Sequence, residues 1–170
     1  MRSFFLFTIL FVSVIALNAQ GVGLNLTVVD ASEVPAAVVS AQASYFPGST
    51  VTVWEKQTAS AKGSSASKYV ATFKNGGQNA RARYTAAGTG LSATTYYKAG
   101  ELPTAIQTAA LNNYAGYKLM HGEKLQLLEK TYLVYRIQLR KGAQKLTVYV
   151  DENGNEVSGS KVPEEIQEAE

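Results

Sequence analysis

The chain has 170 residues, with 16 lysines and arginines, 13 aspartates and glutamates, one histidine and no cysteine. The absence of cysteine excludes disulfides, thiolate nucleophiles and cysteine-based metal sites, so stability has to come from a packed core. The small basic excess does not indicate nucleic-acid binding.

Residues 1–19 have the pattern of a secretory signal peptide. Arg2 precedes an apolar run from Phe4 to Leu17, and this run is shorter than the roughly 20 residues of a membrane-spanning helix. Cleavage is expected before Gln20, and a buried N-terminal helix is the alternative. The sequence therefore predicts an exported chain with no membrane span after cleavage.

Residues 20–32 form an N-terminal segment, in which Leu24, Leu26 and Val28 alternate as in a strand. The following residues, 33–100, predict a helix and then about four antiparallel strands. Pro35 suits a first helical turn, and Gly48 stands where the helix should end. The polar stretch 56–68 is expected to be a mobile loop between two strands.

Residues 101–158 repeat this pattern. The offset is 68 in the helix, where Phe46 matches Tyr114, and 66 in the strands, where Tyr69 matches Tyr135. Such self-similarity predicts two equivalent structural units. Residues 159–170 are expected to form a polar C-terminal tail, either a short exposed helix around Ile166 or a frayed end.

The fold class is therefore α+β. Two tandem units, each a helix plus four strands, are expected to join into one antiparallel sheet of about eight strands, with the helices on one face. Joining the sheets removes an exposed edge from each unit and leaves the opposite, polar face open.

These motifs resemble a bacterial periplasmic family described as PepSY-like or beta-lactamase-inhibitor-protein-like. The resemblance covers about Glu33 to Val157 and rests on the doubled apolar-Pro-x-x-apolar helix start, the aromatic residue and glycine that close each helix, the Tyr-x-apolar-x-apolar strand, and the turn from Asp151 to Gly154. It implies a tandem pair of units in a secreted protein that binds other proteins through its sheet. The signal sequence is also similar to those of Bacteroidetes. Because this chain lacks the disulfides and loop residues of the inhibitor, beta-lactamase inhibition does not carry over.

The candidate binding surface is the polar face of the sheet. Arginine and tyrosine are common in binding hot spots, although the same residues can simply keep an exposed sheet soluble. Trp54, Tyr96 and Tyr97 could enlarge the surface, and core packing is the alternative for Trp54. The candidate residues are Arg81, Arg83, Arg136, Gln138, Arg140, Lys145, Thr147 and Tyr149.

No catalytic or metal site is expected. His121 is the only histidine, so a histidine-based triad or a multi-histidine metal site cannot form. Asp151, Asn153 and Glu156 resemble part of a calcium loop, but their spacing fits a hairpin turn better. No cofactor is expected.

The favoured hypothesis is a non-enzymatic module that binds another periplasmic or outer-membrane protein, as an inhibitor or an accessory subunit. The alternative is a sensor that binds a small ligand or envelope component between the helices and the sheet. The sequence leaves the oligomeric state open.

Overall fold

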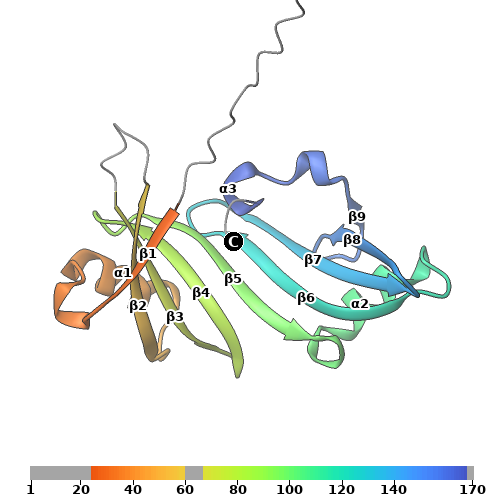
Figure 1. Ribbon diagram of the computed structural model, residues 1–170, viewed down its shortest axis with the longest axis horizontal. Helices are drawn as coiled ribbons and strands as arrows, with labels where there is room; N and C mark the ends of the chain where they lie inside the picture. The colour runs from red at the N-terminus through yellow and green to blue at the C-terminus, as the bar shows by residue number, and fades with distance from the viewer. Residues whose placement is uncertain (1–23, 60–66, 168–170) are drawn as a thin grey trace, which may run out of the picture.

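The computed structural model describes residues 24–59 and 67–167. Within these ranges nine strands form one antiparallel sheet, and their order in the sheet is their order along the chain (Figure 1). The predicted signal peptide lies outside the described residues. The structure is therefore α+β with a single open sheet, one strand wider than the sheet expected for two joined units.

The first part of the chain forms the strand expected around Leu26, then a helix and four strands. The strand expected to stop near Lys56 continues to Ala59, so the polar loop is shorter than predicted, and residues 60–66 lie outside the described residues. The elements are β1 (Leu24–Val29), η1 (Ala31–Glu33), α1 (Ala36–Tyr45), β2 (Val51–Ala59), β3 (Lys68–Asn75), β4 (Gln78–Thr85) and β5 (Gly90–Lys98).

The second part has the same order of elements except that it lacks a counterpart of β1, and a short C-terminal helix follows it. Although η2 and α2 separate β5 from β6, these two strands pair directly, and this pairing makes the sheet continuous. The elements are η2 (Ala99–Glu101), α2 (Thr104–Asn112), β6 (Lys118–Leu127), β7 (Tyr132–Lys141), β8 (Gln144–Val150), β9 (Glu156–Val157), η3 (Gly159–Lys161) and α3 (Glu164–Gln167).

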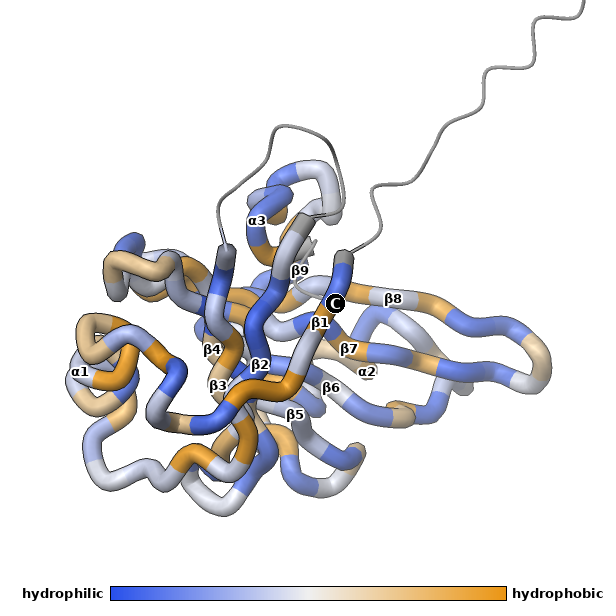
Figure 2. The backbone as a smooth tube through the Cα atoms, turned by 60° about the vertical axis from the view of Figure 1, so that its left-hand side comes forward, coloured by the Kyte–Doolittle hydropathy of each residue, from blue (hydrophilic) through white to orange (hydrophobic). Residues whose placement is uncertain are grey.

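Helices α1 and α2 cover one face of the sheet, which we call the core face. Val38 of α1 is fully buried in a cluster with Phe73 and Tyr84, and Ile106 of α2 is buried in a second cluster with Ile137. Figure 2 shows hydrophobic and hydrophilic residues alternating along the strands, as expected for a sheet whose two faces differ. The helices are thus fixed to the sheet by side chains at the apolar positions of the sequence.

A buried hydrogen-bond chain ties α1 to β4. The Tyr84 hydroxyl donates to Gln42 Oε1 at 2.7 Å, and Gln42 Nε2 donates to Ser49 Oγ at 3.0 Å. Burial raises the pKa of Tyr84 far above its ordinary value, so this side chain stays neutral. The chain satisfies polar groups that would otherwise be costly beneath the helix.

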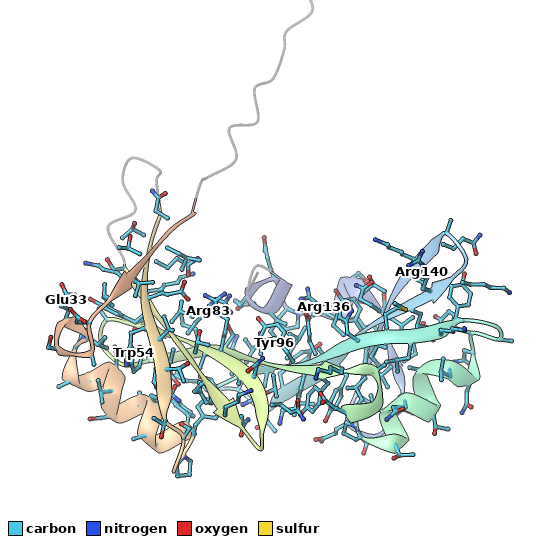
Figure 3. All side chains as sticks on the ribbon, turned by 60° about the horizontal axis from the view of Figure 1, so that its bottom comes forward. Glu33, Trp54, Arg83, Tyr96, Arg136 and Arg140 are labelled. Atoms are coloured by element: carbon cyan, nitrogen blue, oxygen red, sulfur yellow. The ribbon has the colours of Figure 1, made fainter. Side chains whose placement is uncertain are left out.

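Helix α3 corrects two expectations. It packs against the opposite face of the sheet, which we call the α3 face, so the helices are not all on one side (Figure 3). Val162 and Ile166 are 4% and 1% exposed, and they contact Leu125, Leu127 and Val134. We call the cluster of these five residues the satellite core. The C-terminal segment is therefore docked rather than frayed, because its two apolar side chains are buried in this cluster. Residues 168–170 lie outside the described residues.

No helix within residues 24–59 and 67–167 combines the length and the hydrophobicity needed to cross a membrane.

Candidate protein-binding face

The candidate residues all lie on the α3 face. Arg81 and Arg83 alternate with the core residues of β4. Arg136, Gln138 and Arg140 alternate with the core residues of β7, and cross-strand register places Lys145, Thr147 and Tyr149 beside them on β8. The period of two along each strand therefore puts them on the predicted face.

The residues on this face are not equally accessible. Arg83 is only 7% exposed, and Figure 3 shows Arg83 and Arg136 on either side of α3. Tyr149 is half-buried against the satellite core under α3. The expectation of a fully open face is thus wrong near α3. Among the predicted residues, the exposed ones are Arg140, Lys145 and Thr147.

Two of the predicted arginines are held in ion pairs. Arg136 donates to Glu123, with the two side chains 12% and 11% exposed. Arg81 pairs with Glu55, where the side chains are 26% and 20% exposed. The charges of these arginines are largely neutralised inside the protein, so they are poor candidates for direct contact with a partner.

The two glutamates also lie on the candidate face, and the sequence did not single them out. Glu55 and Glu123 stand at the same offset of 68 residues as the matched helix positions. Their strand partners stand at the strand offset of 66 but differ in residue type, since Glu55 lies opposite Val70 and Glu123 lies opposite Arg136. An acidic residue at a matched position in both halves was the signal available in the sequence.

The sequence also did not single out an exposed apolar patch on this face. Leu26, Val28 and Val53 are 47%, 70% and 37% exposed, and they lie at the β1–β2 end of the sheet. Strand register puts Val28 beside Glu55 on the α3 face. The alternation of Leu26 and Val28 along β1 was visible in the sequence, but apolar side chains at such positions are usually assigned to a core.

An open depression of about 530 Å³ lies where β5 ends and β6 begins, beside the β3–β4 hairpin. Tyr96, His121 and Met120 line it, together with Lys98 and Glu101. Tyr96 is half-buried on the α3 face and so can extend the candidate surface. The residues that line the depression are both polar and apolar, and they include no convergent set of catalytic groups.

The other aromatic residues considered for the surface belong to the core face. Trp54 is 8% exposed and packs in the cluster beneath α1, as the core-packing alternative expected. Tyr97 packs at the edge of the cluster beneath α2, where burial raises the pKa of its hydroxyl. Trp54 therefore cannot contribute to a surface on the α3 face, whereas Tyr97 also lines the depression beside Tyr96.

The turn between β8 and β9 is organised by a carboxylate. Asp151 Oδ1 accepts hydrogen bonds from the backbone N–H groups of Asn153 and Asn155, at 2.9 and 2.8 Å. The Asn155 side chain donates to Oδ2, and these contacts lower the pKa of Asp151. In the described part of the chain, no group of three or more acidic or histidine side chains is arranged to hold a metal ion.

No protein-family model matches the sequence, and no curated protein is significantly similar to it. Solved structures do share the fold. A BLIP-like protein from Bacteroides fragilis is 19% identical with a TM-score of 0.56, and the match covers 72% of this chain and 82% of that one. A DUF2874 family protein from Bacteroides ovatus is 15% identical with a TM-score of 0.55, over 73% and 84% of the two chains.

A third neighbour, from Bacteroides eggerthii, is provisionally named as a periplasmic protein. It is 19% identical with a TM-score of 0.51, over 73% of this chain and 86% of that one. The sequence motifs predicted this resemblance from the helix starts and the strand pattern. The chain has the fold of the BLIP-like and DUF2874 proteins of Bacteroides.

Proposed function

We propose that this chain is a non-enzymatic periplasmic module that binds another envelope protein through the α3 face. The supporting observation is that, in the described chain, this face of a nine-stranded sheet is covered only by the short segment of residues 159–167 that includes α3. Apolar side chains at one end and basic ones at the other remain exposed there, as at Val28 and Lys145. Such mixed, accessible surfaces are typical of protein interfaces.

Export to the periplasm belongs to the same proposal. Residues 1–19 would direct export and be removed before Gln20, and neighbours with this fold include one named as periplasmic. Mass spectrometry of the chain purified from its host should find Gln20 at the N-terminus. A chain that retains Arg2 would contradict this part of the proposal.

We also propose that residues 33–100 and 101–158 are two equivalent units. Support comes from the pairings of the matched glutamates. Glu55 lies opposite Val70, and Glu123 lies opposite Arg136. The two glutamates are 68 residues apart and their partners are 66 apart, which are the offsets of the sequence repeat. A sheet built from both units offers more area than one unit, enough for an interface of ordinary size. Residues 159–167 then form an addition that covers part of that area.

The small-ligand alternative has weaker support. A site between the helices and the sheet would need a cavity there, but Val38, Phe46 and Ile106 fill this space and are almost fully buried. Stabilisation of the purified protein by a small molecule in a thermal-shift screen, without a protein partner, would favour this alternative.

Site-specific photo-cross-linking in intact cells tests the binding face. A photoreactive residue at Val28 or Thr147, both exposed on the α3 face, should cross-link to the same partner protein. The matched controls are Ser40 of α1 and Thr108 of α2, which are exposed on the opposite side of the molecule. Cross-links at the controls but not at Val28 and Thr147 would refute the proposal.

A further inference from the structure

We propose that the β6–β8 end of the α3 face binds an acidic polypeptide segment of the partner. This inference rests on the proposed function and adds the chemistry of the partner. It concerns three basic residues from three neighbouring strands, which we call the cationic row: Lys118 of β6, Arg140 of β7 and Lys145 of β8.

The cationic row places like charges next to one another. Lys118 lies directly opposite Arg140, and Arg140 lies directly opposite Lys145, on the face that also carries Gln138 and Thr147. Side chains at directly opposed positions are about 5 Å apart at Cβ, where like charges are destabilising. Folding therefore works against electrostatic repulsion at this place, and bound carboxylates would relieve it.

No acidic side chain of the described residues neutralises the row. The ion pairs within these residues use Glu55, Glu101, Glu123 and Glu165, and none of them includes a member of the row. Arg140 Nε donates to the backbone oxygen of Gly142, which leaves its charge uncompensated. Elsewhere on the same face, Arg81 and Arg136 are each matched by a glutamate.

The surroundings of the row suit a polypeptide rather than a bare polyanion. Met120, at a bulge in β6, is 46% exposed, and it lines a depression of about 230 Å³ together with His121 and Arg140. Beside the row, Gln138 Nε2 donates to Thr147 Oγ1 at 2.8 Å, so both groups can also accept or donate to a ligand backbone. Arginine and methionine are enriched in protein interfaces.

The spacing of the row differs by only about 2 Å from that of alternate side chains in an extended segment, a difference that the long side chains of the row can span. Adjacent strands are about 4.8 Å apart, and alternate side chains of an extended chain are about 6.6 Å apart. A segment that crosses β6, β7 and β8 can thus present carboxylates at every second position to the flexible ends of Lys118, Arg140 and Lys145. Charge-assisted hydrogen bonds from a guanidinium to a carboxylate are among the stronger polar contacts.

Fluorescence anisotropy of a labelled extended peptide with glutamate at every second position tests the inference. We expect binding at low ionic strength that weakens steeply with salt, because exposed charges are screened over about 10 Å at 0.1 M. Arg140→Glu with Lys145→Glu should weaken binding by about tenfold or more. The control, Lys68→Glu with Lys161→Glu, changes net charge equally at exposed sites outside the row and should have little effect.

Three results would overturn the inference: no binding of the peptide to the wild-type protein at low salt, equal loss in the control variant, or row-dependent binding of vesicles containing phosphatidylglycerol in preference to the peptide. Thermal unfolding supplies an independent measurement. Arg140→Gln should raise the unfolding midpoint, since it removes the central charge of a repulsive row, and a lowered midpoint would count against the inference.

Cross-linking separates this inference from the proposed function. If the row variant still cross-links to the partner at Val28 and also retains peptide binding, the acidic-segment inference fails while the proposed function stands. If the wild-type protein binds the peptide through the row but cross-links only through α1 and α2, the proposed function fails.

Discussion

Arg136 Nε donates a hydrogen bond to Glu123 Oε2 at 2.6 Å, and Arg136 Nη2 lies 2.5 Å from the same oxygen in the ion pair. The two residues face each other on β6 and β7 and are almost buried beside α3. A buried charge that loses its partner is strongly destabilising, whereas removing both charges costs much less. This pair therefore belongs to the stability of the sheet, although arginines on a sheet face suggest binding when the sequence is read alone.

Glu123→Gln should lower the free energy of unfolding by about 3 kcal/mol, because it leaves Arg136 without a charged partner. The matched substitution Glu55→Gln should cost only about 1 kcal/mol, since its pair with Arg81 is more exposed. Urea unfolding measures both values. Equal losses in the two variants would show that burial does not distinguish the pairs.

Tyr84→Phe should destabilise the protein by about 1 to 3 kcal/mol, because the buried Gln42 Oε1 loses its hydrogen-bond donor. Tyr114→Phe is the control, since the Tyr114 hydroxyl donates to Glu156 at an exposed position and should contribute little. Chemical denaturation of the two variants provides the comparison. An unchanged midpoint for Tyr84→Phe would mean that Gln42 finds another donor.

Ile166→Ala should cost about 2 to 5 kcal/mol if α3 unfolds together with the sheet, because Ile166 is 1% exposed. If α3 detaches by itself, global stability changes little, but binding of a hydrophobic dye should rise as Leu125 and Val134 become accessible. Val39→Ala on α1, where the side chain is 43% exposed, is the control. A variant with neither effect would contradict the docked position of α3.

Asp151 should make the β8–β9 turn sensitive to acid. Hydrogen bonds, first from the Asn155 side chain, hold the folded-state pKa of Asp151 below its ordinary value of 3.8. A lowered folded-state pKa means that this carboxylate stabilises the fold above pH 3.8, and that the contribution is lost as the pH falls below 3.8 through the folded-state pKa.

The thermal midpoint of Asp151→Asn, measured against the wild type at several pH values, checks this expectation. The difference should be present at neutral pH and shrink in acid below pH 3.8, as the wild-type carboxyl becomes protonated. Asn153→Ala is a suitable control, because only the backbone of Asn153 contacts Asp151. If the difference in thermal midpoint did not depend on pH, the charge of Asp151 would not contribute to the stability of the turn.

Phe46 and Tyr114 stand at matched positions of the sequence repeat, but the structure buries them to different extents. Phe46 is 8% exposed and its ring centre is 4.6 Å from that of Phe73, as a helix anchor requires. Tyr114 stands at the matched position but is only half-buried, with its hydroxyl on Glu156. The two sites share a place in the sequence pattern, but they differ in burial because their neighbours differ.

The sequence by itself determined the helix starts, the alternating strands and the face on which each strand residue lies. These features follow from local periodicity, since a strand places successive side chains on opposite faces and a helix repeats every 3.6 residues. Arg81, Arg136 and Lys145 could therefore be assigned to one face without coordinates.

Only the tertiary structure decided which residues on that face are accessible. The docking of α3 through Val162 and Ile166, and the capture of Arg136 by Glu123, depend on contacts between distant segments. Local periodicity carries no information about such contacts. The same apolar-Pro-x-x-apolar start precedes all three helices, yet α3 packs on the face opposite to α1 and α2. Helix α3 packs on the α3 face because Leu125, Leu127 and Val134 form an apolar patch there, whereas α1 and α2 cover the core face.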